Sequence, residues 1–357
     1  MKIVTIVGAR PQFIKAAPVT KALREAGHTE FLLHTGQHYD YGMSKIFFEE
    51  MGIPEPDVNL AVGSGTQGWQ TGKMLMGIEE VLLAEKPDWV LVYGDTNSTL
   101  AGALAAVKLH MPVSHVEAGL RSFNREMPEE HNRLLTDHCS ELLFCPTQTA
   151  VDNLASEGIR HGVHLVGDTM HDAVLQYAAV ASERSRILQD LGLNPKGYLL
   201  ATIHRPYNTD IAGNLENILR AFEEIGERVV FPVHPRTRQK VVELDVQFRT
   251  GQRSGDIKII EPVGYLDMLM LEKNARVILT DSGGMQKEAY FFGVPCVTLR
   301  PETEWVELVQ LGYNKLAGAD VRDICDAYEA MIGVEVENAS LYGDGSAGQK
   351  IVEVLSA

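Results

Sequence analysis

The sequence is poor in cysteine and in long apolar runs. Its 357 residues include four cysteines, too few and too scattered for a disulfide framework or a Cys-x-x-Cys metal site. We therefore expect reduced thiols in a cytoplasmic protein. No apolar stretch approaches the roughly 18 residues of a membrane-spanning helix. The first residues turn polar too early for a signal peptide, so we expect none.

Positive charge is also scarce. The chain carries 32 Lys and Arg against 48 Asp and Glu, a formal net charge of −16, and no basic run. Binding to nucleic-acid phosphates or to an anionic membrane needs a clustered basic surface, so we expect neither partner. A small anionic ligand is not excluded, because a local pocket can oppose the net charge of the whole chain.

Several catalytic signatures are missing as well. There is no His-Glu-x-x-His motif and no His, Cys and Asp set with metal-ligand spacing, so the sequence demands no metal. Gly-x-Ser-x-Gly is absent, which argues against an α/β-hydrolase. The glycine-containing segment after the first apolar run is neither a dinucleotide fingerprint nor a Walker A loop.

What the chain does contain is a regular alternation of short apolar runs and helical patterns. The alternation predicts an α/β protein with doubly wound parallel sheets. The predicted strands are Lys2–Val7, Glu30–His34, Asp88–Val92, Pro112–Val116, Leu142–Cys145, Tyr198–Thr202, Val229–Val233, Ile257–Ile260, Val277–Thr280 and Val294–Leu299. The predicted helices include Pro18–Ala26, Thr99–Leu109 and Ile211–Ile225. Because the pattern weakens near residues 170–196, we predict two Rossmann-like domains with a hinge at 165–195.

Polar residues gather where the predicted strands end. Ligands of open α/β sheets bind beyond the carboxyl ends of the strands, so a cleft between the two domains is the predicted site. The residues at these ends are Arg10, Gln37, His38, Asp95, Glu117, His204, His234 and Ser282.

The segment from Gly8 to Lys15 is a candidate for binding a phosphate group. It places Arg10 and Lys15 beside a predicted helix start, where backbone N–H groups already favour an anion. The alternative is a solvated turn with a lysine that extends to water.

A second phosphate candidate is the segment from Asp281 to Glu288. Gly283 and Gly284 allow the backbone to approach a diphosphate closely, and Ser282 adds a hydroxyl donor. Glu288 has the reach to accept both hydroxyls of a ribose. The alternative is an ordinary capping turn, which Asp and Ser both favour.

Three carboxylates are candidates for proton transfer. Asp95 and Glu117 follow predicted strands, and Glu129 follows Pro128 at a predicted helix start beside Glu130. Several carboxylates in one cleft repel one another, which raises the pKa of at least one and suits acid–base work. The alternatives are a helix N-cap for Asp95 and favourable helix N-terminal placement for Glu129.

Two histidine and arginine pairs follow strands of the second half. His204 precedes Arg205, and His234 lies two residues before Arg236. Each pair suits either acid–base chemistry or phosphate binding, and a structural role is the alternative for each histidine.

Taken as a set, seven segments resemble the non-hydrolysing UDP-N-acetylglucosamine 2-epimerases, in the same order and over nearly the whole chain. The segments are GARPQFIK, TGQHYD, YGDTNST, HVEAGLRS, MPEEHNR, the HR of residues 204–205, and LTDSGGMQKEA. The resemblance implies the GT-B fold, in which two Rossmann-like domains face a cleft and a C-terminal helix crosses back to the first domain. We accordingly divide the chain into residues 1–168, 169–340 and 341–357.

The same resemblance implies interconversion of UDP-GlcNAc and UDP-ManNAc by elimination of UDP to 2-acetamidoglucal and re-addition. Asp95, Glu117 and Glu129 match the catalytic carboxylates of the family, and His204 matches its active-site histidine. The predicted substrate- and UDP-binding residues are Arg10, Lys15, Gln37, His38, Arg205, His234, Arg236, Ser282, Gly283, Gly284 and Glu288. The resemblance implies no metal or NAD, a homodimer, and a role in cell-surface polysaccharide synthesis.

The chain departs from the family pattern at three places. Tyr207 replaces the Glu of the usual His-Arg-x-Glu-Asn, and Gln37 matches a residue of the bacterial allosteric site whose other partners are not all recognisable in residues 63–73. Residues 301–307 replace the usual Thr-Glu-Arg-Pro-Glu and resemble the branch acting on UDP-2,3-diacetamido-glucuronate. Arg236 or Arg238 is then the candidate partner of the sugar carboxylate.

Four other functions stay open at this point. One is the same epimerisation on UDP-2,3-diacetamido-glucuronate. A hydrolysing epimerase is disfavoured, because such enzymes typically carry Gly-Asp-Arg where this chain has Gly94-Asp95-Thr96. A GT-B glycosyltransferase is disfavoured, because it has no evident need for the three acid–base carboxylates. A non-catalytic nucleotide-sugar sensor is disfavoured for the same reason.

Overall fold

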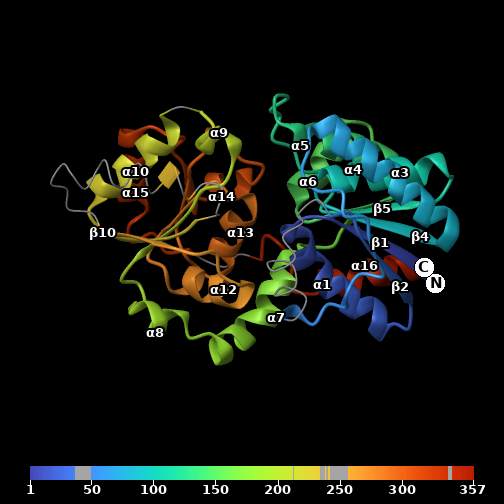
Figure 1. Cartoon of the computed structure of the whole chain (residues 1–357), viewed down its shortest axis with the longest axis horizontal. Coiled ribbons are helices and arrows are strands. Elements are labelled where there is room, and N and C mark those ends of the chain that lie inside the picture. The colour runs from blue at the N-terminus through green and yellow to red at the C-terminus, as the bar shows by residue number, and fades with distance from the viewer. Residues whose placement is uncertain (37–49, 212, 234–237, 239, 242–255, 337–339) are drawn as a thin grey trace. The chain divides into compact units, whose positions relative to one another are not determined.

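The structure, a computed structural model, forms two compact units (Figure 1). It describes residues 1–36, 50–211, 213–233, 238, 240–241, 256–336 and 340–357. Unit 1 comprises Met1–Gln176 and Ser340–Ala357, and unit 2 comprises Tyr177–Ala339. The boundary expected after residue 168 falls at the start of helix α7 (Thr169–Arg184), whereas the division lies inside that helix.

Unit 1 is built on a parallel sheet, as the α/β interpretation predicts. Its described residues form seven strands in the order β3-β2-β1-β4-β5-β6-β7. The strands are β1 (Lys2–Val7), β2 (Thr29–His34), β3 (Val58–Asn59), β4 (Trp89–Tyr93), β5 (Val113–Val116), β6 (Leu142–Cys145) and β7 (Val163–Leu165). The strand order changes direction between β1 and β4, and such a switch point is where open α/β sheets bind ligands.

Helices cover both faces of this sheet. On one face, α4 packs against both α3 and α5, and on the other face α1 packs against the C-terminal helix α16 (Figure 1). Apart from α7, the helices in the described part of unit 1 include α1 (Arg10–Glu25), α3 (Gln67–Glu85), α4 (Asn97–Lys108), α5 (Pro128–Cys139), α6 (Gln148–Ser156) and α16 (Ala347–Ser356). The C-terminal helix therefore belongs to the first unit, as predicted.

The start predicted for the first helix, Pro18, is wrong. Helix α1 begins at Arg10 and runs through Pro18. Pro11 lies in the first turn, where its missing N–H group has no partner to lose. The helix continues past the second proline with a buried face that is mostly apolar and also contains Gln12, Lys15 and Thr20. Lys15 is consequently a buried helical residue, so the solvated-turn alternative is wrong for it.

Unit 2 repeats the parallel arrangement. Its described residues form six strands in the order β10-β9-β8-β11-β12-β13. The strands are β8 (Leu199–Thr202), β9 (Arg228–Pro232), β10 (Asp256–Ile260), β11 (Ile278–Thr280), β12 (Cys296–Thr298) and β13 (Asn314–Leu316). The helices formed by its described residues include α8 (Ile187–Leu191), α9 (Pro206–Thr209), α10 (Asn214–Ile225), α12 (Tyr265–Asn274), α13 (Gly283–Phe291), α14 (Val306–Gln310) and α15 (Val321–Met331). The switch point of this sheet lies between β8 and β11.

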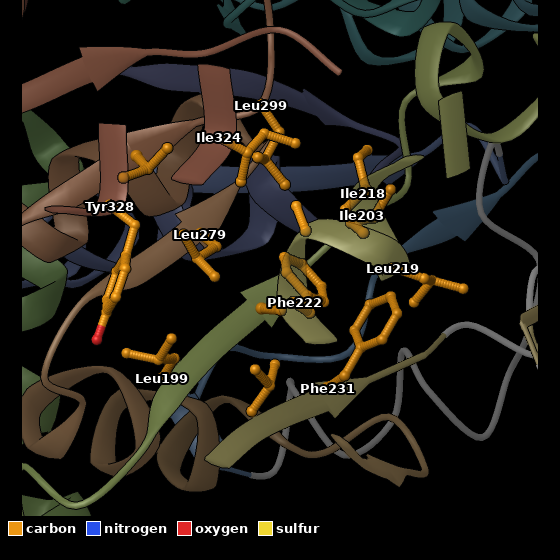
Figure 2. Close-up of a cluster of buried hydrophobic side chains, with 14 of the residues drawn as sticks. Leu199, Ile203, Ile218, Leu219, Phe222, Phe231, Leu279, Leu299, Ile324 and Tyr328 are labelled. Carbon is orange, nitrogen blue, oxygen red and sulfur yellow. The ribbon is translucent and has the colours of Figure 1, made fainter. Parts of the chain in front are cut away.

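One hydrophobic cluster of unit 2 forms where α10 and α15 pack together over the sheet. Figure 2 shows Phe222 of α10 beside Phe231 of β9, and their ring centroids lie 6.3 Å apart in an edge-on arrangement. Tyr328 of α15 and Leu279 of β11 belong to the same cluster. Each such buried side chain contributes about 1.5–3 kcal/mol, so this packing fixes the strand ends that carry the site residues of unit 2. No helix in the described part of the chain is long and apolar enough to cross a membrane.

A buried carboxylate fixes the last helix to unit 1. Asp172 of α7 is 8% exposed, and its Oδ2 accepts a 2.8 Å hydrogen bond from the backbone N–H of Gly348 in the first turn of α16. Burial raises the pKa of Asp172 to about 6; the N–H groups of Gly348 and Ala347 oppose this rise, and the charges of two further aspartates add to it.

We expect the protonated form of Asp172 to stabilise the folded protein. Its folded pKa lies above the ordinary 3.8, so this contribution is fully present below about pH 4 and is lost as the pH rises through about 6. The shift corresponds to on the order of 3 kcal/mol. Asp172→Asn should therefore raise the melting temperature relative to wild type more at pH 7.5 than at pH 4.5, as thermal unfolding would show. Asp190→Asn, an exposed change, is the control, and an equal difference at both pH values would contradict the assignment.

Candidate active site

The carboxyl-end edge of unit 1 brings Lys15 and Glu117 together. Lys15 lies on α1, and Glu117 directly follows β5. Lys15 Nζ and Glu117 Oε2 form an ion pair in which the two side chains are only 11% and 7% exposed. Gly94, after β4, has φ +62°, and a Cβ atom there would lie 3.2 Å from Glu117 Oε2 and 3.3 Å from Lys15 Nζ. Because Gly94 has no side chain, the turn that follows β4 can pass directly against the Lys15–Glu117 ion pair.

Glu117 itself has an unusual backbone. Its φ of +73° lies in the left-handed region, which a non-glycine residue rarely adopts. The N–H groups of Glu117 and Ala118 both donate to the carbonyl oxygen of Phe144, at 3.0 and 3.1 Å. Backbone strain of this kind costs about 1–3 kcal/mol and persists where the surrounding structure imposes it, typically at functional sites.

Asp95 is held by an arginine on helix α5. Arg133 Nη2 lies 2.6 Å from Asp95 Oδ2, and the side-chain amide of Asn132 donates to the Asp95 carbonyl oxygen at 2.9 Å. The N-cap alternative for Asp95 is wrong, because Thr96 caps α4 and accepts a hydrogen bond from the Thr99 N–H group. The Asp95 carboxylate is 28% exposed while its arginine partner is buried, so it is oriented and still accessible.

The adjacent glutamates Glu129 and Glu130 have different surroundings. Glu130 is buried and accepts hydrogen bonds from Ser122 N–H at 2.9 Å and Phe123 N–H at 3.0 Å. Burial alone would raise the pKa of Glu130, but the Ser122 donors and the Arg133 charge outweigh it and hold the pKa below its usual range. Glu130 thus fixes the preceding loop, and the half-buried Glu129 stays the proton-transfer candidate at this helix end.

On unit 2, His204 is anchored by a buried aspartate. Asp281 follows β11 and is 0% exposed, and its carboxylate accepts the backbone N–H groups of His204 and Arg205 at 3.0 Å each. The same carboxylate accepts the Asn208 side-chain amide at 3.0 Å and lies 3.1 Å from His204 Nδ1. Burial would raise the pKa of Asp281, but the charge and hydrogen bonds of His204 outweigh it, so the pKa is lowered. The imidazole of His204 is thereby oriented while its side chain is 53% exposed.

Ser282, Gly283 and Gly284 form the start of α13 beside this aspartate. Ser282 Oγ accepts from the Met285 N–H group at 3.4 Å, so the capping interpretation of the serine is confirmed. A Cβ at Gly283 would lie 2.6 Å from Glu304 Oε1, which explains a glycine at this position. The cap uses the N–H group of Met285, and the remaining N–H groups in the first turn of α13 favour an anion.

Glu288 lies farther along the same helix and is buried. Its carboxylate faces the hydroxyl of Tyr265: burial, followed by the Glu288 charge, raises the pKa of Tyr265 well above its usual value. Arg10 and Arg205, two of the predicted arginines, are partly buried at the starts of α1 and α9. Arg238 pairs with Glu261. The predicted residues Gln37, His38, His234 and Arg236 lie outside the described part of the chain.

Sequence reasoning missed three residues of this arrangement. Arg133, which orients Asp95, lies inside a helix, where an arginine is ordinarily a solvated surface residue. Asp281 was given no role of its own beyond the alternative of a capping turn, although a charged residue directly after a buried strand is a signal for a buried partner. Lys287 is 0% exposed, and its Nζ lies 4.1 Å from the centroid of the Trp305 ring. The sequence around Lys287 gives no sign of this contact.

Comparison with known proteins decides the family. A family model described as UDP-N-acetylglucosamine 2-epimerase matches residues 21–356 of this chain. The protein belongs to the UDP-N-acetylglucosamine 2-epimerase family. The resemblance stated from the sequence motifs is thus confirmed, and so is the α/β class with two parallel sheets.

Other members of the UDP-N-acetylglucosamine 2-epimerase family resemble the chain over its full length. A Methanococcus maripaludis UDP-N-acetylglucosamine 2-epimerase homolog is 56% identical over 99% of each chain. A UDP-2,3-diacetamido-2,3-dideoxy-D-glucuronate 2-epimerase of Pseudomonas aeruginosa is 50% identical, covering 100% of this chain and 99% of that one. The crystal structure of a Methanocaldococcus jannaschii UDP-GlcNAc 2-epimerase in complex with UDP-GlcNAc and UDP matches with a TM-score of 0.93 at 47% identity, covering 100% of this chain and 99% of that chain.

Proposed function

We propose that the protein catalyses the reversible epimerisation of UDP-N-acetylglucosamine to UDP-N-acetylmannosamine at C2. The observation that carries the proposal is the full-length match to the M. jannaschii UDP-GlcNAc 2-epimerase bound to UDP-GlcNAc and UDP. The chemistry at the two switch points supports it independently. Unit 1 presents carboxylates for proton transfer, and unit 2 presents a helix start and an oriented histidine suited to a diphosphate.

The reaction balances without an added reagent. A base removes the C2 proton, the C2–H electron pair forms the C1=C2 double bond, and the C1–O bond breaks to release UDP with that electron pair. UDP then re-adds at C1 while an acid delivers a proton to the opposite face of C2. The C2 proton is weakly acidic, so its removal needs a positioned base, and exclusion of water keeps hydrolysis from competing with re-addition.

The residues of unit 1 supply the acid–base groups in this scheme. Asp95, Glu117 and Glu129 are the carboxylates assigned to proton transfer, and the accessible Asp95 fits a group that meets the sugar. Lys15 compensates the buried charge of Glu117 and keeps its carboxylate in place.

The residues of unit 2 bind the leaving group. The first-turn N–H groups of α13, together with His204 and Arg205, stabilise the negative charge that develops on the diphosphate as the C1–O bond breaks. Glu288 is assigned to the ribose, and Arg10 of unit 1 to substrate binding.

A second substrate is favoured by one specific observation. Residues 301–307 read Pro-Glu-Thr-Glu-Trp-Val-Glu, and the P. aeruginosa relative at 50% identity is named for UDP-2,3-diacetamido-2,3-dideoxy-D-glucuronate. Trp305 packs on buried Lys287 close to the α13 start. This segment is therefore the part of unit 2 that would distinguish the two sugars.

Product analysis separates these functions. Purified protein is incubated with each UDP-sugar, and the products are followed by proton and phosphorus NMR. We expect UDP-ManNAc to accumulate from UDP-GlcNAc, with higher kcat/KM than for the diacetamido-glucuronate. The opposite ranking would assign the second substrate. Free N-acetylmannosamine with UDP would instead show a hydrolysing enzyme, and no change of either sugar would leave a transferase or a sensor.

We also propose that the protein is a cytoplasmic homodimer serving cell-surface polysaccharide synthesis. Closed dimers are the commonest assemblies of this kind, and α3 exposes Trp69, Met76 and Leu83 at seven-residue spacing on one face. The four cysteines are free thiols, which fits a reducing compartment. Light scattering after size exclusion tests the dimer: a monomer at micromolar concentration would contradict it.

A further inference from the structure

A fully buried histidine lies behind the candidate carboxylates of unit 1. His115 of β5 is 0% exposed. Its Nδ1 lies 2.7 Å from Asp137 Oδ1, and its Nε2 lies 2.7 Å from the carbonyl oxygen of Gly94. A carbonyl oxygen and an ionised carboxylate oxygen can only accept hydrogen bonds, so both ring nitrogens must donate. A histidine that donates from both nitrogens is an imidazolium cation.

The charges around this ring agree with a cation. Burial would raise the pKa of Asp137, but His115 and Arg121 outweigh it and lower the pKa, so Asp137 is ionised. Arg121 Nη1 lies 2.7 Å from Asp137 Oδ2, and the same guanidinium donates to both oxygens of Glu157, at 2.8 and 2.7 Å. Counting Asp137, Glu157 and Arg121, a neutral ring leaves two carboxylates against one guanidinium, and a protonated ring balances them. Glu157 lies at the outer end of the cluster, where it is 22% exposed and 3.8 Å from His138 Nε2, so water and that histidine share its charge.

The same ring holds the turn that leads to Asp95. Gly94 donates its N–H to the Val116 carbonyl oxygen at 3.0 Å and accepts from His115 through its own carbonyl oxygen. Both polar groups of the glycine are thus tied to β5. Glu117 follows that strand two residues after His115, so one side chain fixes the position of Asp95 relative to Glu117.

We propose that His115 is a positioning residue that stays protonated in the folded protein and fixes the position of Asp95 relative to Glu117. It acts through the Gly94 carbonyl and Asp137 and does not touch the substrate. The protonation state is independent of the reaction, whereas the kinetic effect rests on the proposed function.

Imidazole nitrogen NMR on the wild-type protein tests the protonation state. His34 is an internal reference, because its Nδ1 accepts the Gly36 N–H at 2.9 Å and burial lowers its pKa, so its ring is neutral. At pH 7.5 we expect the His115 ring to show two protonated nitrogens and the His34 ring to show one. The His115 ring signals are assigned in the wild-type protein by correlating them with the backbone nuclei of the same residue. A single protonated nitrogen on His115 would overturn the proposal, and this result needs no folded variant.

Kinetics of His115→Gln test the positioning role. A displacement of catalytic groups by about 1 Å can lower the rate about 100-fold, so we expect kcat to fall by about 10- to 100-fold with little change in KM. His164→Gln, on β7 of the same sheet and in contact with Phe144, is the matched control and should keep wild-type kcat. Wild-type kcat in folded His115→Gln would overturn the positioning role. If the wild-type protein turns over neither UDP-sugar, the proposed function fails while the NMR result still decides the protonation state.

Discussion

Asp95→Asn is expected to lower kcat at least about 100-fold, because it removes a general acid–base group. This fall corresponds to an increase of about 2.7 kcal/mol in the activation free energy. The amide keeps an oxygen that can accept from Arg133, so the geometry around the 2.6 Å contact should survive while proton transfer is lost. KM should therefore change little. Initial rates of UDP-ManNAc formation, measured over a range of UDP-GlcNAc concentrations, separate the two parameters.

The control for this substitution flanks the same strand at its other end. Asp88 precedes β4 at its opposite end and accepts the Lys2 N–H at 2.7 Å, so Asp88→Asn changes a similar charge far along the strand from the carboxyl-end edge. It should leave kcat within a factor of about two. Near wild-type turnover in Asp95→Asn would remove Asp95 from the mechanism.

Asp281→Asn is expected to have the largest structural effect in unit 2. An amide would turn an NH2 group toward some of the donors that the carboxylate now accepts, and it would remove the charge that faces His204. Breaking a buried, multiply bonded carboxylate costs on the order of 3 kcal/mol. We expect a lower melting temperature at pH 7 and at least about tenfold weaker binding of UDP by calorimetry, because the His204–Arg205 backbone loses its anchor.

The stability effect of Asp281→Asn should depend on pH in a defined direction. The pKa of Asp281 is lowered in the folded protein, so its contribution is present above the ordinary value of 3.8 and is lost as the pH falls through the lower folded pKa. The stability difference between wild type and Asp281→Asn should therefore shrink in acid. Asp323→Asn, an exposed change on α15, is the control and should alter neither stability nor UDP binding. A variant at Asp281 that is as stable as wild type would contradict the anchoring role.

The interiors of the sheets were predictable from the sequence because their strands are continuous apolar runs. Strands β1 and β6 match their predicted bounds, and the central strands of unit 2 differ by only a residue or two at their ends. Edge strands β3, β7 and β13 were missed, since they are two or three residues long and have no apolar run. Pairing with a neighbouring strand, and not local propensity, makes these segments strands.

The candidate site was predictable only in part, for a physical reason. Parallel strands place their carboxyl ends at one edge of each sheet, so the positions of Asp95, Glu117, His204 and Ser282 followed from the predicted strand ends. The side chains that contact these residues from distant helices could not be predicted in this way. Arg133 reaches Asp95 from α5, and the distinction between buried Glu130 and half-buried Glu129 depends on a loop folding back onto the helix start.

Solvent exchange at C2 is the most direct test of the account. UDP-GlcNAc is incubated with the enzyme in D2O until both epimers are present, and the sugars are examined by proton NMR and mass spectrometry. Proton removal and return at C2 predict deuterium at that carbon in UDP-ManNAc and in the UDP-GlcNAc that remains. The Asp95→Asn variant should slow incorporation and epimerisation together. Formation of UDP-ManNAc that keeps the original C2 hydrogen would contradict the account.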